Sequence, residues 1–257
     1  KNEFETISLN NLGTNNIYSE PSDVTRTFAP HPFVPPEDEM TTRCNEIFSI
    51  QVGGLATRLF HTGIKKAVVG ISGGLDSTLA LLVMVKTFDK LGLPRENIVG
   101  ITMPGFGTTG RTYNNSLNMM KSLGVTIKEV DIKPACLQHL KDIDHDLSIL
   151  DVSYENTQAR ERTQILMDYA NKIGGLVVGT GDLSELVLGW ATYNGDHMSM
   201  YAVNTSIPKT LVRYMVKYAA LYEMDEAAKE TLLDVCDTPV SPELLPADEH
   251  GEIQQVT

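Results

Sequence analysis

The sequence lacks the features that mark membrane proteins, disulfide-rich secreted proteins and nucleic-acid-binding proteins. Its longest apolar run, residues 79–85, is far shorter than the ~20 residues that a membrane-spanning helix needs. It has only three cysteines, none in a CxxC pair, which argues against a disulfide framework or a zinc site and favours a cytoplasmic location. Its 21 basic residues face 33 acidic ones, and the net charge of −12 argues against duplex nucleic acid or an anionic membrane as a partner.

Residues 1–40 differ in composition from the rest of the chain. They contain five of the twelve prolines (Pro21, Pro30, Pro32, Pro35 and Pro36), many Asn, Ser and Thr residues, and no helical period. This composition predicts an extended arm or linker, with a disordered tail as the alternative. We therefore expect residues 41–257 to form the folded domain.

From residue 41 onward, apolar runs alternate with helical patterns. A first helix is expected to end at Gly63, and residues 105–110 and 191–208 are expected to be loops. The predicted strands span residues 66–71, 97–103, 125–131 and 176–179. Further predicted helices span residues 77–91, 111–123, 156–172, 183–190, 209–222 and 225–235. This alternation predicts an α/β fold with a doubly wound parallel sheet flanked by helices, whose ligands bind outside the carboxyl ends of the strands.

The loop after the first predicted strand, residues 70–78 with the sequence GISGGLDST, has the composition of a phosphate site. Paired glycines allow close backbone approach, while serine hydroxyls and the amides of a helix N-terminus attract anions. Asp76 would repel a phosphate unless a cation lies between them, so it implies Mg²⁺. The chain has no Gly-Lys-Ser/Thr sequence, which excludes a Walker A motif. The alternative is an ordinary strand-to-helix turn.

The second loop contains a competing motif. Residues 105–110, GFGTTG, match GxGxxG, and Glu129 and Asp131 follow about 20 residues later, as in a dinucleotide-binding oxidoreductase. However, the motif lies in the second strand–helix unit, after Pro104, and it does not explain Asp76. We favour a flexible loop over a nucleotide that is poorly ordered without ligand.

Later segments supply further candidate ligands. On the predicted helix 156–172, Asn156, Arg160 and Thr163 share one face, while Arg162 is expected to point elsewhere; the alternative is a solvated face paired with Glu155 and Glu161. After the fourth strand, either Asp182 or Glu185 can face the site, and Asp76 with Glu185 can share one Mg²⁺. Trp190 and Tyr193 can stack on a heteroaromatic ring. Lys209 opposes the dipole at a helix start, which suggests an anionic ligand nearby.

The SGGLDS sequence at residues 72–77 resembles the signature of the ATP pyrophosphatase, or PP-loop, family. Together with VGTGDLSE, TYNGD, IPKT and DTPVSPEL, it resembles in particular the NAD⁺ synthetase family, in order from about residue 31 to 257. The resemblance implies ATP contacts from Gly70, Ser72, Gly73, Gly74, Asp76, Ser77, Thr78, Met103, Thr180, Lys209 and Ser241. It implies contacts to nicotinic acid adenine dinucleotide from Asn156, Arg160, Glu185, Trp190, Tyr193 and Asp196. It implies Mg²⁺ at Asp76 and Glu185, and catalytic roles for Asp76 and Lys209.

The implied reaction is a ligase reaction in two steps. The nicotinate carboxylate attacks the α-phosphate of ATP, giving an acyl-adenylate and pyrophosphate; ammonia then displaces AMP and gives NAD⁺. The chain resembles the synthetase half of the glutamine-dependent form, which implies a separate glutaminase domain, a further C-terminal segment and a homodimer. It departs from the ammonia-dependent form at Tyr193 and Met200. Rival readings are another PP-loop enzyme, such as GMP synthetase or a tRNA-thiolation enzyme, and a non-catalytic ATP-binding module.

Overall fold

Short runs rich in β-branched residues form the centre of the molecule. A computed structural model describes residues 27–238 and residue 244. In it, five strands form one sheet in the order β3-β2-β1-β4-β5, and all neighbouring strands are parallel. The strands are β1 (Ala67–Gly70), β2 (Ile98–Thr102), β3 (Thr126–Glu129), β4 (Leu176–Gly179) and β5 (Tyr201–Ala202). The predicted α/β fold with a doubly wound parallel sheet is confirmed.

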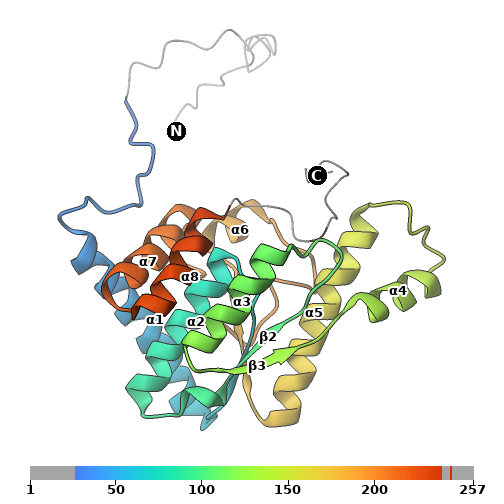
Figure 1. The fold of residues 1–257 in the computed structure, drawn as a ribbon, viewed down its shortest axis with the longest axis horizontal. Coiled ribbons are helices and arrows are strands. Elements are labelled where there is room, and N and C mark those ends of the chain that lie inside the picture. The colour runs from blue at the N-terminus through green and yellow to red at the C-terminus, as the bar shows by residue number, and fades with distance from the viewer. Residues whose placement is uncertain (1–26, 239–243, 245–257) are drawn as a thin grey trace, which may run out of the picture. The chain divides into compact units, whose positions relative to one another are not determined.

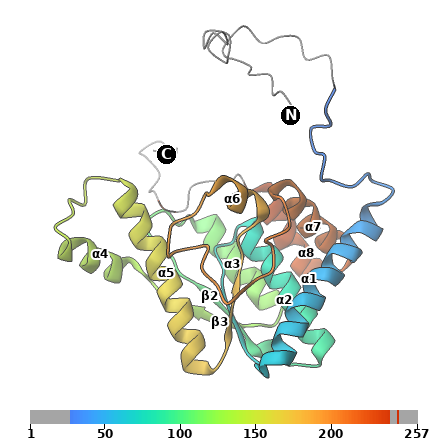
Figure 2. The same cartoon turned by 180° about the vertical axis from the view of Figure 1, so that it is seen from behind.

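Helices cover both faces of this sheet, as Figures 1 and 2 show from opposite sides. One face carries α1 (Met40–Thr62), α2 (Leu75–Leu91), α3 (Gly110–Ser122), α7 (Lys209–Tyr222) and α8 (Glu226–Asp237). The other face carries α4 (Lys133–Asp142) and α5 (Val152–Ile173). The short helix α6 (Leu183–Leu188) and a 3₁₀ turn (Arg95–Asn97) complete the elements.

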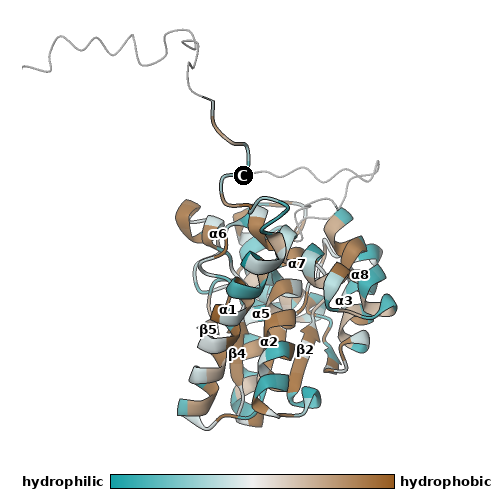
Figure 3. Ribbon diagram, turned by 90° about the vertical axis from the view of Figure 1, so that its left-hand side faces the viewer, coloured by the Kyte–Doolittle hydropathy of each residue, from teal (hydrophilic) through white to brown (hydrophobic). Residues whose placement is uncertain are grey.

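Successive side chains along each strand point to opposite faces of the sheet, and this divides the apolar core into two layers. Val69 and Val178 contribute to the layer beneath α2, whereas Val68 and Val177 contribute to the layer beneath α5. All four side chains are buried, so the central strands are apolar on both faces. Figure 3 shows β2 and β4 in the colour of hydrophobic residues. This two-sided burial is typical of a parallel sheet, and it places polar side chains at the strand ends rather than along the strands.

Most predicted elements occur close to their predicted positions. β4 and α7 have the predicted bounds, while α2 begins at Leu75, two residues before the predicted start. The prediction omitted α4, whose ten residues carry little apolar periodicity, and β5, a two-residue strand inside the predicted loop 191–208. β5 forms because Tyr201 and Ala202 pair with Val178 and Gly179, a long-range contact that has no local signal.

The helices and strands begin only after the proline-rich segment. The described residues from Phe33 onward form one unit, and its first helix begins at Met40 after the N-cap residue Glu39. The described residues 27–32 contain no helix or strand. Among the described residues, no helix is both long enough and apolar enough to cross a membrane.

Candidate active site

The candidate site lies between β1 and β4, where the order of the strands along the sheet reverses. β1 pairs with β2 on one side and with β4 on the other, so the connections after β1 and β4 leave a crevice at their carboxyl ends. Three helices begin at this edge: α2 directly after β1, α6 after β4, and α7 after β5. Each helix start directs backbone amides and the positive end of a helix dipole toward the crevice.

The loop between β1 and α2 is held in a tight conformation by its own hydroxyl groups. The Gly74 amide donates to Ser72 Oγ at 3.2 Å, and Thr78 Oγ1 donates to the Gly74 carbonyl at 2.8 Å. Ser77 Oγ lies 3.3 Å from Ser72 Oγ. Gly73 adopts a positive φ of 87°. The loop is therefore preorganised around the start of α2, as the sequence predicts for a phosphate site.

Gly73 is the residue in this loop that tolerates substitution least. A Cβ atom there would clash with the backbone carbonyl of Thr112, in addition to the strain of the left-handed backbone. We expect Gly73→Ala to cost about 2–5 kcal/mol, the sum of left-handed strain and overpacking. Gly92→Ala is the matched control, because Gly92 has φ 65° but nothing within 4 Å of the added Cβ. Urea unfolding of both variants measures the difference, and equal losses would contradict this account.

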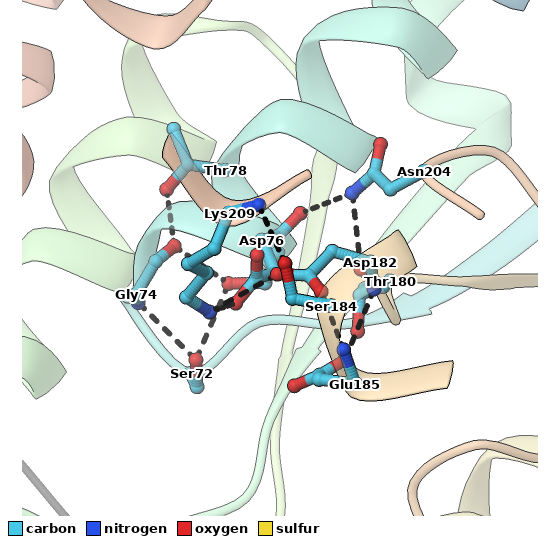
Figure 4. A network of polar contacts seen from close by, with 11 residues as sticks. Ser72, Gly74, Asp76, Thr78, Thr180, Asp182, Ser184, Glu185, Asn204 and Lys209 are labelled. Atoms are coloured by element: carbon cyan, nitrogen blue, oxygen red, sulfur yellow. Dashed lines mark hydrogen bonds and ion pairs between the residues drawn. The ribbon is translucent and has the colours of Figure 1, made fainter. Parts of the chain in front are cut away.

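One lysine and three carboxylates converge opposite this loop (Figure 4). Lys209, the first residue of α7, forms an ion pair with Asp76, and its Nζ lies 3.6 Å from Asp182 Oδ2. Asp182 is fully buried, and its Oδ1 accepts the backbone N–H of Glu185 at 2.9 Å. Glu185 Oε2 accepts the Asp182 amide at 3.0 Å, which completes a capping box at the start of α6. The cluster therefore has one positive charge against three acidic groups.

Burial and mutual repulsion shift the pKa values in this cluster. The pKa of Asp76 is raised, chiefly by burial and also by the neighbouring Asp182, although the Lys209 ammonium acts to lower it. Burial also raises the pKa of Glu185 to about 7, with Asp76 and Asp182 adding to the shift. For Lys209, burial lowers the pKa, but the surrounding carboxylates outweigh burial and the net shift is upward. The Lys209 ammonium is therefore held in its charged form, but one ammonium does not balance the negative charge of the neighbouring acids.

Glu185 should make the metal-free chain less stable as pH rises. Its pKa in the folded chain is about 7, against 4.5 for an ordinary glutamate, so the folded state binds more protons between these values. Stability then falls as pH rises from 4.5 through 7. We expect Glu185→Gln to raise the melting temperature at pH 8 in EDTA and to change it little at pH 4.5. Thermal unfolding across this range is the measurement, and an equal effect at both pH values would refute the assignment.

A cavity of about 730 Å³ opens beside this cluster. The predicted site residues that line it are Gly70, Ser72, Gly74, Asp76, Ser77, Met103, Thr180, Glu185, Trp190, Tyr193, Asp196 and Lys209. Four predicted residues do not line it: Gly73, Thr78, Asn156 and Arg160. Ser241 lies outside the described residues. As ligand contacts, all of these residues remain predictions.

The wall formed by α5 differs from the expectation. Arg162, expected to point elsewhere, lines the cavity, and its Nε donates to the Met103 carbonyl at 3.1 Å. The exposed side chain of Arg160 instead donates to the Tyr193 carbonyl at 3.1 Å. The expectation for Arg162 was wrong because residue spacing shows which residues share a helix face but not which face meets the sheet. Ile165 and Leu166, one turn after Arg162, pack on the sheet and give the missing signal.

The segment after α6 forms the outer wall of the cavity. Trp190 is half exposed and Tyr193 is 76% exposed, so both rings are accessible. Within this segment, Asp196 Oδ1 accepts the Thr192 amide at 2.8 Å, and Thr192 Oγ1 ties the segment to α5 by donating to Asn156 Oδ1 at 2.7 Å. Asn156 and Asp196 thus shape this wall, whatever ligand it contacts.

The GxGxxG segment, residues 105–110, contributes Thr108 to one edge of the cavity, and the preceding Met103 and Pro104 line the same edge. Its Phe106 amide donates to Gln158 Oε1 at 3.0 Å, and none of its glycines has a positive φ. The tight glycine turn with a positive φ lies in the loop after β1 instead, at Gly73. Whether residues 105–110 close over a ligand remains a prediction.

The sequence did not predict the roles of three polar residues that hold this site together. Asp182 was considered only as an alternative to Glu185, yet both acids reach the cluster. Ser184 Oγ accepts the backbone N–H of Lys209 at 3.1 Å and joins the starts of α6 and α7. Asn204, fully buried, donates to the carbonyls of Asp76 and Thr180. The bonds of Ser184 and Asn204 connect segments that are distant in sequence, so no local pattern predicts them.

Comparison with known proteins assigns the chain to a family. The family described as NAD synthase matches residues 48–225. The glutamine-dependent NAD(+) synthetase of Mycobacterium leprae is 44% identical over 230 residues, covering 87% of this chain and 34% of the relative. The NH(3)-dependent NAD(+) synthetase of Pyrobaculum aerophilum is 35% identical, covering 72% of this chain and 63% of the relative.

A solved structure supports the same relationship. The glutamine-dependent NAD+ synthetase of Acinetobacter baumannii, in complex with adenosine diphosphate, matches with a TM-score of 0.68 and 28% identity. The match covers 74% of this chain and 36% of that chain. The chain thus spans about a third of the length of its glutamine-dependent relatives. By the extent of these matches, the chain belongs to the NAD synthase family.

Proposed function

We propose that this chain is the synthetase part of a glutamine-dependent NAD⁺ synthetase. It would convert nicotinic acid adenine dinucleotide, ATP and ammonia into NAD⁺, AMP and pyrophosphate. The observation that carries the proposal is the Lys209 ammonium held between Asp76 and Asp182, beside the preorganised loop at the start of α2. A positive charge and unpaired amides on one side of a cavity, with acids beside them, suit a polyphosphate and its counter-ion.

ATP would bind with its phosphates at the loop after β1. Ser72 and Ser77 supply hydroxyl groups there, and the first turn of α2 supplies backbone amides. The ion pair with Asp76 holds the Lys209 ammonium beside this loop. From there it would neutralise charge that develops on the leaving pyrophosphate. Stabilisation of this kind is often the largest contribution to catalysis.

A divalent cation fits the acidic residues present. Asp76 Oδ1 and Asp182 Oδ2 are buried and have no hydrogen-bond partner among the described residues. No three His, Cys, Asp or Glu side chains in the described part of the chain are arranged to hold a metal alone. Mg²⁺ commonly takes only one or two carboxylates and completes its shell with water and phosphate oxygens. Asp76 and Glu185, with Asp182 beside them, would hold Mg²⁺, which would offset the charge of the reacting phosphates.

The dinucleotide would occupy the opposite wall of the cavity. Trp190 and Tyr193 offer exposed rings that can stack on its heteroaromatic bases. Arg162 brings a guanidinium group to the same cavity, near the loop after β2. The substrate carboxylate would attack the α-phosphorus and release pyrophosphate, and ammonia would then attack the activated carbonyl carbon and release AMP. No protein side chain needs to become covalently attached in either step.

The nitrogen source follows from the resemblance to the longer relatives. A glutaminase domain elsewhere in the full-length protein would supply ammonia, while the isolated chain would use free ammonia. We also propose residues 1–40 as the connecting arm, a cytoplasmic location and a homodimer. The exposed apolar side chains of Val187 and Leu188 on α6 support a further contact surface beside the cavity.

A single assay tests the proposed reaction. The chain is incubated with ATP, Mg²⁺, ammonium chloride and nicotinic acid adenine dinucleotide, and the products are separated and quantified. We expect NAD⁺, AMP and pyrophosphate in equal amounts, with no NAD⁺ when the dinucleotide or ammonia is omitted. ADP and inorganic phosphate as products would overturn the proposal. AMP and pyrophosphate formed only with another acceptor would indicate a different PP-loop enzyme.

A further inference from the structure

Asn204 occupies an unusual position between the two acidic segments of the site. It lies between β5 and α7, is fully buried and does not line the cavity. Its Nδ2 donates to the backbone carbonyl of Asp76 and to that of Thr180, both at 3.0 Å (Figure 4). Both hydrogens of the amide nitrogen are therefore used.

The sheet itself does not fix the distance between these two segments. β1 and β4 are paired only at Ala67 with Leu176 and at Val68 with Val177. Beyond these pairs the strands run toward separate loops, one leading to Asp76 and the other to Asp182 and Glu185. Asn204 bridges the gap that the sheet ladder leaves open, one bond to each segment.

Asn204 is itself supported from a third element. Gln51 on α1 donates from Nε2 to Asn204 Oδ1 at 3.2 Å and to the Val203 carbonyl at 2.9 Å. These bonds fix the orientation of the Asn204 amide, so that its NH₂ group faces the two carbonyls. The helix start at Asp76 and the loop at Thr180 are thereby tied to the outer helix α1.

We propose that Asn204 is a positioning residue that sets the spacing between the Asp76 carboxylate and the Asp182–Glu185 pair, and with it the affinity for the nucleotide-bound divalent cation. This inference rests on the proposed function. Asn204 acts through the backbone of Asp76 and Thr180 and touches no substrate. Three acids that repel one another need an external restraint to hold a spacing suited to one cation, and a buried amide supplies one without adding charge.

The test measures metal binding directly as well as activity. Mn²⁺ serves as the probe, and its dissociation constant is measured by electron paramagnetic resonance with a non-hydrolysable ATP analogue present. We expect Asn204→Ser to weaken Mn²⁺ binding roughly 10- to 100-fold, the usual cost of losing a group that orients metal ligands. It should also raise the Mg²⁺ concentration needed for half-maximal turnover, with smaller change at saturating Mg²⁺.

Two further variants separate positioning from general loss of stability. Asn115→Ser is the matched control, because Asn115 is a buried amide that donates to Asp234 at 2.7 Å and does not line the cavity. It should leave Mn²⁺ binding unchanged. Gln51→Leu removes the support of Asn204 and should weaken Mn²⁺ binding in the same direction by a smaller factor. If Asn204→Ser does not fold, the Mn²⁺ affinity of Gln51→Leu tests the inference in its place.

The failure of this inference differs from the failure of the proposed function. Unchanged Mn²⁺ binding in a folded Asn204→Ser chain, or in Gln51→Leu when Asn204→Ser does not fold, overturns the inference even if the parent chain makes NAD⁺. An equal loss in Asn115→Ser also overturns it, as does a parent chain that binds no Mn²⁺. A parent chain that binds Mn²⁺ with the ATP analogue but makes no NAD⁺ overturns the proposed function alone.

Discussion

Replacing Asp76 by Asn should strongly reduce the proposed metal-dependent formation of NAD⁺ while leaving the fold as stable as before. Asp76 brings a buried oxygen without a hydrogen-bond partner to the site, and burial raises the pKa of its carboxyl group. Asn has nearly the same shape but carries no charge, so it relieves repulsion from Asp182 and Glu185. We expect kcat to fall roughly 10²- to 10³-fold or more, the cost of removing one electrostatic contribution to transition-state stabilisation.

The measurement pairs steady-state kinetics with thermal unfolding in EDTA. Asp225→Asn is the control. Asp225 is the N-cap residue of α8 and accepts the Ala228 amide, and it does not line the cavity, so this variant should keep full activity. Nucleotide affinity in EDTA should survive in Asp76→Asn, because the loop hydroxyls and helix amides remain. Turnover within threefold of the parent chain would show that Asp76 does not hold the cation. It would favour a binding module or a different catalytic arrangement.

Replacing Lys209 by Met should reduce both activity and stability. It removes the positive charge that lies among the buried Asp182 and the partly buried Asp76 and Glu185. Breaking a buried pair costs about 3–5 kcal/mol, and partial exposure of the Lys209 side chain reduces our expectation to about 1–3 kcal/mol. Loss of charge stabilisation should lower kcat roughly 10²- to 10³-fold.

Double substitution distinguishes the two residues. Asp76→Asn combined with Lys209→Met should recover stability relative to Lys209→Met alone, because one fewer carboxylate is left unpaired. Activity should not recover.

Added Mg²⁺ should partly restore the melting temperature of Lys209→Met, since a cation that binds only the folded state stabilises it. Lys217→Met, at an exposed position on α7, is the control and should change neither quantity. Equal stability of Lys209→Met and the parent chain in EDTA would contradict the charge account.

The sequence predicted the parallel α/β fold and four of its five strands because the signals for them are local and repeated. Apolar runs followed by helical spacing indicate parallel strands, and Gly92 and Gly174 end α2 and α5 in the left-handed conformation. The compact conformation of the loop after β1 was predictable for the same reason, while phosphate binding there remains a prediction. The loop's glycines, hydroxyls and acid lie within nine residues, and their chemistry does not depend on distant partners.

Elements without such signals were missed. α4 has a proline in its first turn and few apolar residues, and its Cys136 and Leu140 are buried in clusters that include residues of α5 and Phe106. β5 consists of two residues whose pairing with β4 defines it. In both cases the deciding contacts come from residues far along the chain.

By itself, the sequence determined the α/β fold class and predicted a phosphate site in the loop after the first strand. Its resemblance to the family implied Asp76 and Lys209 as catalytic residues, and Asp76 with Glu185 as metal ligands. Only the tertiary structure decided that Asp182 joins Glu185, that Arg162 rather than Arg160 lines the cavity, and that Asn204 ties the acidic segments together. The physical reason is the range of the interactions. Helix spacing and glycine turns are set by neighbouring residues, whereas helix rotation, charge clustering and buried amide bridges depend on how distant segments pack.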